Sequence, residues 1–194
     1  MTTSLFVLWS GGADSTFLVE HSLADPAYDL VLAGYVHIQN NEAKAASELA
    51  AIERMLPLLR ANPRFEYAGI IAQVNYPRTN PNLAYKQIPI WLHALVEAIH
   101  FPVDEVAIGY CGGDDAAQHI ATIQTIYASY QPLMHRRLPP LRFPLAQYTK
   151  AEVPRASALH CGTKSSTANI RSPRQRGGMS PVNVAASASH GRRD

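Results

Sequence analysis

Short runs of consecutive apolar residues alternate along the chain with segments in which apolar residues recur every three or four positions. Continuous runs of this length are typical of strands buried on both faces, and the wider spacing is typical of helices with one buried face. The runs predict strands at Leu5–Trp9, Leu30–Val36, Tyr67–Val74, Val106–Gly109 and, as a short fifth, Arg142–Leu145. The spacing predicts helices at Ser15–Leu23, Glu42–Leu56 (ending before Pro57), Ile88–His100 and Asp114–Tyr130. A capping box at Thr149–Glu152 predicts one more short helix.

Strands separated by helices indicate βαβ units and a parallel sheet. Right-handed crossovers then predict a three-layer α/β/α, doubly wound, Rossmann-like domain. Ligands of such domains bind beyond the carboxyl ends of the strands. The loops expected there are Ser10–Asp14, His37–Asn41, Asn75–Gln87 and Tyr110–Asp115.

The chain has 194 residues, 47% of them apolar, which is enough for one sizeable core. Residues 162–194 hold six basic residues and one acid, a formal charge of +5, and contain no Leu, Phe, Tyr or Trp. We therefore predict a folded domain over residues 1–161 and a basic, disordered, low-complexity tail over 162–194. The domain carries eleven bases and fourteen acids, a charge of −3, so nucleic acid is not an expected partner.

No apolar run approaches the roughly 20 residues that cross a bilayer, and the apolar start has no basic flank typical of a signal peptide. Two cysteines cannot build a disulfide framework. The sequence therefore predicts a cytoplasmic protein with no membrane partner.

The segment Ser10–Thr16, Ser-Gly-Gly-Ala-Asp-Ser-Thr, directly follows a predicted strand and opens a helix. Glycines let the backbone turn tightly and approach a ligand, and a helix start offers unpaired N–H groups and a positive dipole end. The hydroxyls of Ser10, Ser15 and Thr16 add donors, so the segment predicts a cradle for phosphate or pyrophosphate. The alternative is a plain turn in which Asp14 or Ser15 only caps the helix. The segment is neither a Walker A loop nor a G-x-G-x-x-G motif.

This string resembles the signature of the PP-loop family, the N-type ATP pyrophosphatases. Within that family the chain is most similar to the 7-cyano-7-deazaguanine synthases. Further matches are Ile108-Gly109 followed by Asp114, and Phe143-Pro144-Leu145 followed by Thr149–Val153. The resemblance covers about residues 3–161 and implies an adenine nucleotide alpha hydrolase-like fold. It also implies an ATP-dependent, AMP-forming ligase that converts 7-carboxy-7-deazaguanine and ammonia to 7-cyano-7-deazaguanine, with a homodimer as one possible assembly.

The resemblance implies ATP and Mg²⁺ as cofactors and Asp14, Ser15 and Lys150 as catalytic residues. Asp14 would orient the loop or help hold Mg²⁺, or it would only cap the helix. Lys150 would reach the phosphates, or it would be a solvated lysine, and Asp114 would contact metal or substrate, or cap a helix. The cofactor-binding residues expected are Leu8, Trp9, Ser10, Gly11, Gly12, Ala13, Asp14, Ser15, Thr16, Gly109 and Asp114.

The 7-cyano-7-deazaguanine synthases also close with a zinc site of four cysteines. Cys161 stands near the first ligand position, but no cysteine follows it, so the other expected Zn²⁺ ligands are missing. One hypothesis is that the tail is a frameshifted remnant of this segment, which the nucleotide sequence would decide. Two other functions stay open: tRNA thiolation or lysidine formation by another PP-loop enzyme, and a degenerate protein that binds nucleotide without catalysis.

Overall fold

The computed structural model describes residues 3–75, 85–99 and 102–153. The chain divides into two units, Met1–Lys164 and Ser165–Asp194, and every described residue belongs to the first unit. The predictions for Cys161, for the tail and for the helix end at His100 therefore lie outside the described residues.

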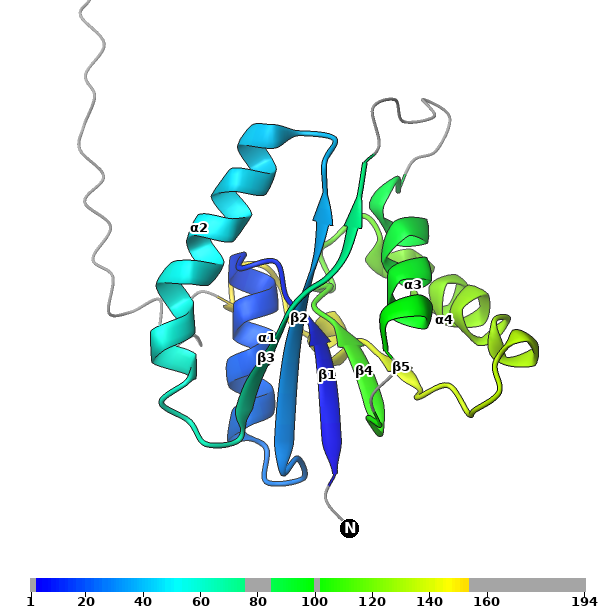
Figure 1. Ribbon diagram of the computed structural model, residues 1–194, viewed down its shortest axis with the longest axis horizontal. Coiled ribbons are helices and arrows are strands. Elements are labelled where there is room, and N and C mark those ends of the chain that lie inside the picture. The colour runs from blue at the N-terminus through cyan, green and yellow to red at the C-terminus, as the bar shows by residue number, and fades with distance from the viewer. Residues whose placement is uncertain (1–2, 76–84, 100–101, 154–194) are drawn as a thin grey trace, which may run out of the picture. The chain divides into compact units, whose positions relative to one another are not determined.

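A five-stranded sheet forms the centre of the described fold (Figure 1). Its strand order is β3-β2-β1-β4-β5, and every pairing is parallel. The predicted parallel α/β architecture is confirmed, because the strand order turns back at β1 as in Rossmann-like folds. The strands are β1 (Ser4–Leu8), β2 (Leu30–Ile38), β3 (Phe65–Val74), β4 (Glu105–Ile108) and β5 (Leu141–Arg142).

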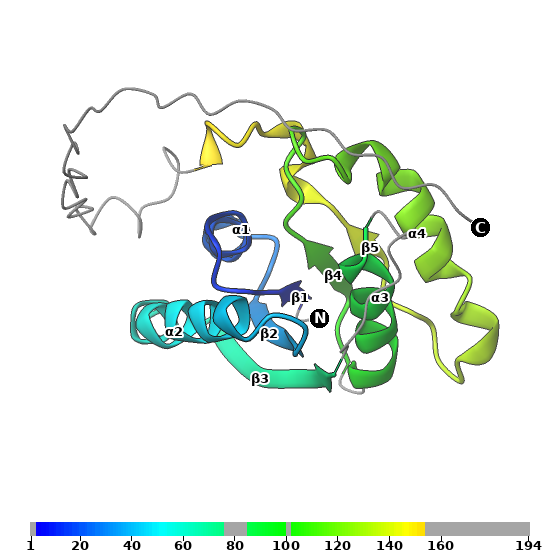
Figure 2. The same cartoon turned by 90° about the horizontal axis from the view of Figure 1, so that it is seen from above.

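Helices cover both faces of this sheet. Figure 2 shows two helices, α1 (Ala13–Ala24) and α2 (Glu42–Leu59), on one face. On the other face lie α3 (Gln87–Ala98) and α4 (Ile120–Ala128). Alternation along the central strand explains how both faces are filled, since successive side chains of a strand point to opposite sides. The side chains of Leu5, Val7 and the following Trp9 belong to the core cluster with α1 and α2. The side chains of Phe6 and Leu8 belong to the core cluster with α3 and α4.

The predicted end of the second helix is wrong. Helix α2 continues through Pro57 to Leu59, and the Arg60 N–H still donates to the Leu56 carbonyl at 2.9 Å. A proline this close to the helix end removes one hydrogen bond, whereas Leu59 is buried against the core. The packing of the final turn therefore overrides the local breaker.

The predicted helix over Asp114–Tyr130 is also wrong at its start. The α-helix begins only at Ile120, after a 3₁₀ turn at Ala117–His119. Asp114 closes a turn instead, because its N–H donates to the Cys111 carbonyl and its carboxylate accepts from the Cys111 N–H. These bonds hold Asp114 in the loop after β4, where it remains beside the strand tips.

The last described segment differs from its prediction in detail. The fifth strand is shorter and earlier than expected, and a 3₁₀ turn over Pro144–Gln147 replaces its second half. The Thr149 N–H donates to the Glu152 carboxylate at 2.7 Å, which is the backward bond of the predicted capping box. The helix predicted after it falls largely outside the described residues, which end at Val153.

Candidate functional site

The loop between β1 and α1 turns tightly at Gly11, directly after the strand tip. Gly11 has φ +74°, and a Cβ there would lie 3.0 Å from the Glu48 carbonyl oxygen and 3.0 Å from the Ala51 Cβ, both on α2. Glycine therefore suits this position for both conformation and space. The first helical hydrogen bond of α1 runs from the Thr16 N–H to the Gly12 carbonyl at 2.9 Å. The N–H groups of Ala13 to Ser15 precede that bond, so they are the unpaired donors of a helix start.

The hydroxyl groups of the loop divide between shaping the loop and filling the core. The Ser15 Oγ accepts from the Ser10 N–H at 3.2 Å, donates to the Gly12 carbonyl at 3.2 Å and lies 3.2 Å from the Ser10 Oγ. The Thr16 hydroxyl accepts from the Trp9 indole N–H at 3.0 Å, and both of these side chains are fully buried. Ser10 and Ser15 thus brace the loop, whereas Thr16 does not offer the ligand donor that the sequence predicted.

Helix α1 begins without a side-chain cap. Its N-cap residue is Gly12, and Asp14 lies inside the first turn. The alternative in which Asp14 or Ser15 serves only as the helix cap is therefore wrong. An acidic group in a first turn is stabilised by the helix dipole, and here it also faces the loop after β4.

The loop forms one wall of a cavity of about 210 Å³ at the carboxyl ends of β1, β2 and β4. The cavity's inner part is polar, with Ser10, Gly12 and Asp14 on one side and Asp114 on the other. Its outer part, between β2 and α2, combines apolar residues such as Val36 and Ile38 with the polar residues Asn40, Lys44 and Glu48. The lining residues from that outer part and from the neighbouring elements, none of which the sequence singled out as ligand-binding, are Tyr35, Val36, Ile38, Asn40, Lys44, Ala45, Glu48, Gln87, Trp91, Ile108 and Tyr110.

In the outer part, the Tyr35 hydroxyl donates to the Glu48 carboxylate at 2.7 Å. Burial, followed by this bond to Glu48, raises the pKa of Tyr35. Lys44 lies 3.7 Å from the other oxygen of the same carboxylate. This arrangement fixes a carboxylate beside an apolar wall, so this part of the cavity suits the base and sugar of a nucleotide better than its phosphates.

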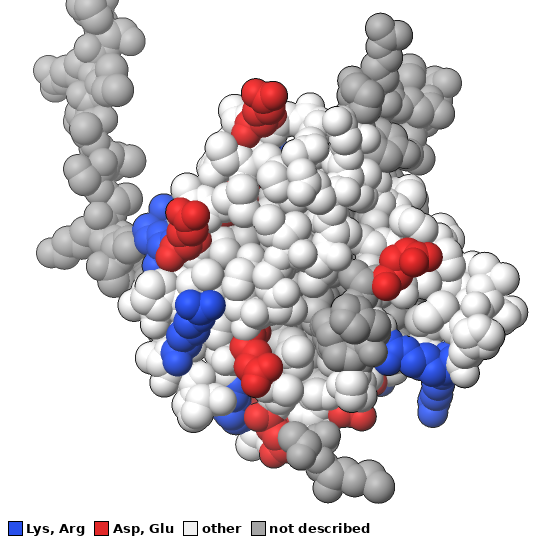
Figure 3. Space-filling view, viewed as in Figure 1, with Lys and Arg blue, Asp and Glu red and all other residues white. Residues whose placement is uncertain are grey.

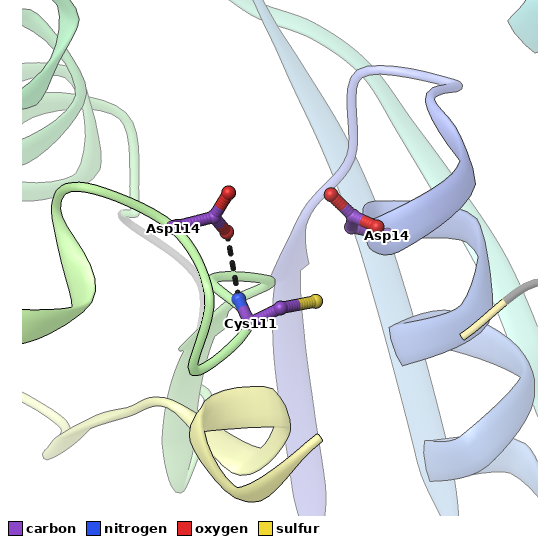
Figure 4. Close-up of side chains that lie close together, drawn as sticks. All are labelled: Asp14, Cys111 and Asp114. Carbon is purple, nitrogen blue, oxygen red and sulfur yellow. Dashed lines mark hydrogen bonds between the residues drawn. The ribbon is translucent and has the colours of Figure 1, made fainter. Parts of the chain in front are cut away.

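Two carboxylates and a thiol converge where the β1–α1 loop meets the loop after β4 (Figure 4). Ligand atoms of Asp14, Cys111 and Asp114 all lie within 4.8 Å of one another. In Figure 4 the two carboxylates face each other across a gap, and the cysteine side chain points toward α1 below them. The Asp114 carboxylate accepts from the Cys111 N–H at 2.8 Å. Carboxylate oxygens are ligands that a hard divalent cation prefers.

Burial, followed by the charge of Asp14, raises the pKa of the Cys111 thiol from 9.0 to about 11. The Cys111 side chain is fully buried. A thiolate is the nucleophilic form of cysteine, so this residue stays protonated and unreactive near neutral pH.

Lys150 reaches the site through Asp114. Its ammonium lies 2.6 Å from the Asp114 Oδ1, and this hydrogen bond and the charge of Asp114 raise the pKa of Lys150. The lysine side chain is 61% exposed, so it approaches from solvent and does not line the 210 Å³ cavity. Its position beside the acidic group was not predicted from the sequence.

Most of the residues expected to bind a cofactor line the cavity, from Leu8 to Ser15 except Gly11, together with Gly109 and Asp114. Gly11 shapes the loop against α2, Thr16 faces the core, and Cys161 lies outside the described residues. A Cβ at Gly109 would lie 3.3 Å from the Asp14 carbonyl, so glycine there lets the two loops pack closely.

The fold and the site together define a Rossmann-like α/β protein with a glycine-containing loop and an acidic cluster at the carboxyl edge of its sheet. No protein-family model matches the chain, and no curated protein matches it. Among the described residues, no helix combines the length and the apolar character needed to span a bilayer.

Proposed function

We propose that this protein is an ATP-dependent, AMP-forming ligase of the PP-loop type, with an adenine nucleotide alpha hydrolase-like fold. It would convert 7-carboxy-7-deazaguanine and ammonia to 7-cyano-7-deazaguanine. The observation that carries the proposal is the β1–α1 loop, which opens its unpaired N–H groups into a cavity whose far wall holds Asp114. The resemblance of Ser10–Thr16 to the PP-loop signature supplies the reaction class.

The geometry suits cleavage between the α and β phosphates of ATP. The N–H groups of Ala13 to Ser15 would bind the β and γ phosphates, which leave together as pyrophosphate. The outer part, between β2 and α2, would hold the adenosine, with apolar residues such as Val36 and Ile38 beside the base. The α phosphate then lies near the junction of the two loops, where an acceptor can reach it.

The chemistry takes two rounds of the same activation. A carboxylate oxygen of 7-carboxy-7-deazaguanine attacks the α phosphorus, pyrophosphate leaves, and ammonia displaces AMP to give the amide. In the second round the amide oxygen attacks the α phosphorus of a second ATP, and pyrophosphate leaves. Loss of both protons from the amide nitrogen and departure of AMP with that oxygen give the nitrile.

Asp14 and Asp114 are the residues that would hold Mg²⁺, since two facing carboxylates fit its preference for oxygen ligands. A bound Mg²⁺ would offset the negative charge of the phosphates. Lys150 would keep Asp114 in place from the solvent side. The chain's two cysteines cannot supply a site of four thiolates, so no step of the proposal depends on zinc.

A thiolation reaction and a lysidine synthase are less well supported. Cys111 is buried and its pKa is raised, whereas a cysteine that carries sulfur must be accessible and readily deprotonated. On the face in Figure 3, basic and acidic side chains are interspersed and form no continuous basic surface for tRNA. Nucleotide binding without catalysis is the remaining second candidate, because the expected zinc ligands are missing.

The experiment is an isotope-transfer assay with both carboxylate oxygens of 7-carboxy-7-deazaguanine replaced by ¹⁸O. The protein is incubated with this substrate, ATP, Mg²⁺ and ammonia, and the products are analysed by mass spectrometry. The proposal predicts one labelled oxygen in each AMP and a nitrile product without label. Unlabelled AMP would contradict acyl adenylation, and ATP binding without any turnover would favour the non-catalytic protein.

Asp14→Asn should abolish the label transfer, because it removes one of the two facing carboxylates. Glu42→Gln is the matched control, since Glu42 is also an acidic residue in the first turn of its helix, α2, and does not line the cavity. The control should react at the rate of the wild-type protein.

A further inference from the structure

A second cavity adjoins the first on the side away from α1. It is an open groove of about 430 Å³ between the start of α3 and the loop after β4. The two cavities share Asn40, Gln87, Tyr110 and Asp114 in their linings. They are therefore two compartments that meet beside the acidic cluster, and a ligand in the second can reach the inner end of the first.

The side chains that line the second compartment offer unused hydrogen-bonding groups. Gln87 is half-buried, and its amide makes no hydrogen bond to any other residue in the described part of the chain. The Asp115 carboxylate likewise has no hydrogen bond or ion pair to another described residue. A half-buried amide without a protein partner is satisfied by water or by a ligand.

The backbone that carries Asp115 is held in place across the groove. The Tyr85 hydroxyl, just before α3, donates to the Asp115 carbonyl at 3.0 Å, and the Gln118 amide donates to the same carbonyl at 3.1 Å. The Tyr85 ring lies 5.1 Å from the His119 ring. The Tyr85 bond thus joins the two sides of the compartment through the Asp115 carbonyl, and it leaves the Asp115 carboxylate available to a ligand.

Aromatic rings support the boundary between the two compartments. The Tyr110 ring stacks on the Phe143 ring, with the ring centroids 6.1 Å apart and the planes at 15°. The centroid of the Trp91 ring lies 6.0 Å from that of the Tyr110 ring. The Tyr110 side chain is half-buried, and its hydroxyl donates to no other described residue. Such a supported ring can stack on a planar ligand without first being ordered.

We infer that the second compartment binds the acceptor of the reaction by the lactam and amine edge of a guanine-type base, with Asp115 and Gln87 as specificity-determining residues. A guanine-type edge presents one carbonyl and two N–H donors in line. The Gln87 amide can donate to the carbonyl, and the Asp115 carboxylate can accept from the ring N–H and the exocyclic amine. The substituent to be activated then lies toward Asp114 and the α phosphate. This inference rests on the proposed function for the identity of the acceptor.

The test measures binding and needs no turnover. We would titrate 7-carboxy-7-deazaguanine, and its analogue without the 2-amino group, into the full chain by calorimetry without ATP. The wild-type protein should prefer the amine-bearing base by about tenfold, as expected for a hydrogen bond to a charged group. Asp115→Asn should lower affinity for that base by a similar factor and lose the preference, because an amide cannot accept both donors.

Gln87→Met is a second variant that keeps side-chain length. It should weaken both bases equally, since both retain the carbonyl. Glu53→Gln, on the exposed face of α2, is the matched control and should bind both bases as the wild-type protein does. Circular dichroism of each variant would verify its fold.

The results separate this inference from the proposed function. An amine preference that depends on Asp115, without any AMP formation, supports the second compartment and contradicts the reaction. AMP formation in which Asp115→Asn and Gln87→Met leave the KM for the acceptor unchanged supports the reaction and overturns the inference. Failure of the wild-type protein to bind either base also overturns the inference.

Discussion

Two loops meet at the carboxyl edge of the sheet, and they are held in different ways. The β1–α1 loop is fixed by bonds within its own short segment, mainly through Ser10, Gly12 and Ser15. The loop after β4 has local bonds between Cys111 and Asp114, but it is also fixed from a distance. The Gly112 N–H donates to the Tyr148 carbonyl at 2.8 Å, and Lys150 pairs with Asp114. The first loop therefore depends on local bonds, whereas the second also depends on a remote segment.

The two loops also offer different chemistry. The first presents backbone N–H groups, which any sequence with the right conformation can supply. The second presents side chains, namely two carboxylates and the Tyr110 ring. Under the proposed function, the first loop would bind the phosphates and the second loop would select the acceptor.

The largest effect is expected from Asp114→Asn, which changes the second loop and leaves the first intact. Loss of one preorganised charge beside the α phosphate should reduce kcat by roughly 10²–10³-fold. The Kd for ATP should change by less than about threefold, since the N–H groups of the first loop remain. Rapid-quench kinetics and equilibrium dialysis measure the two quantities. A large rise in Kd with unchanged kcat would show that the division between the loops is wrong.

Cys111 gives the next largest effect, in chemical reactivity. Its pKa of about 11, raised from 9.0, implies that an alkylating reagent near pH 8 reacts about a hundredfold more slowly with the folded protein than with the unfolded protein. The measurement is labelling followed by mass spectrometry in a Cys161→Ser background. Labelling of the folded chain as fast as in denaturant would contradict the buried cluster.

The raised pKa of Cys111 also predicts how the free energy of unfolding changes with pH. The thiol is neutral in the fold up to a higher pH than in the unfolded chain, so its contribution is complete below pH 9.0 and is lost as the pH rises toward about 11. Urea unfolding of the Cys161→Ser protein, and of the same protein with Cys111→Ala, measures the contribution across that range. A difference between the two that grows with pH would contradict the assigned cause.

A smaller effect separates two neighbouring glycines of the second loop. A Cβ at Gly112 would lie 2.5 Å from the Ala146 carbonyl oxygen, whereas a Cβ at Gly113 meets nothing within 4 Å. Gly112→Ala should lower the free energy of unfolding by about 2 kcal/mol, because the loop must move away from the remote segment. Gly113→Ala is the control and should be close to neutral. Equal urea midpoints for both variants would show that the remote segment does not hold the loop.

The same contrast explains what the sequence could predict. The parallel architecture and the Ser10–Thr16 loop were predictable, since apolar periodicity and a glycine-containing strand-to-helix turn are local signals. The position of the Thr16 hydroxyl was not, because its bond to Trp9 depends on how α1 packs against the core. The continuation of helix α2 through Pro57 likewise depends on the burial of the Leu59 side chain.

The second loop was predictable only in part. Gly109 and Asp114 were identified, but the expected helix start at Asp114 was wrong, because its carboxylate binds the Cys111 N–H instead of a helix terminus. Gln87, Tyr110 and the Lys150 ion pair come together from three segments. No periodicity or motif within one segment predicts that these three segments come into contact, because only the folded sheet brings them together.

The most direct test of the central claim is the fate of ATP labelled with ³²P at the α phosphate. The protein is incubated with this nucleotide, Mg²⁺, ammonia and 7-carboxy-7-deazaguanine, and the labelled products are separated by chromatography. If the β1–α1 loop binds the β and γ phosphates as a leaving pyrophosphate, the label should appear in AMP. Label in ADP would contradict the account, because the bond broken would then be the one between the β and γ phosphates.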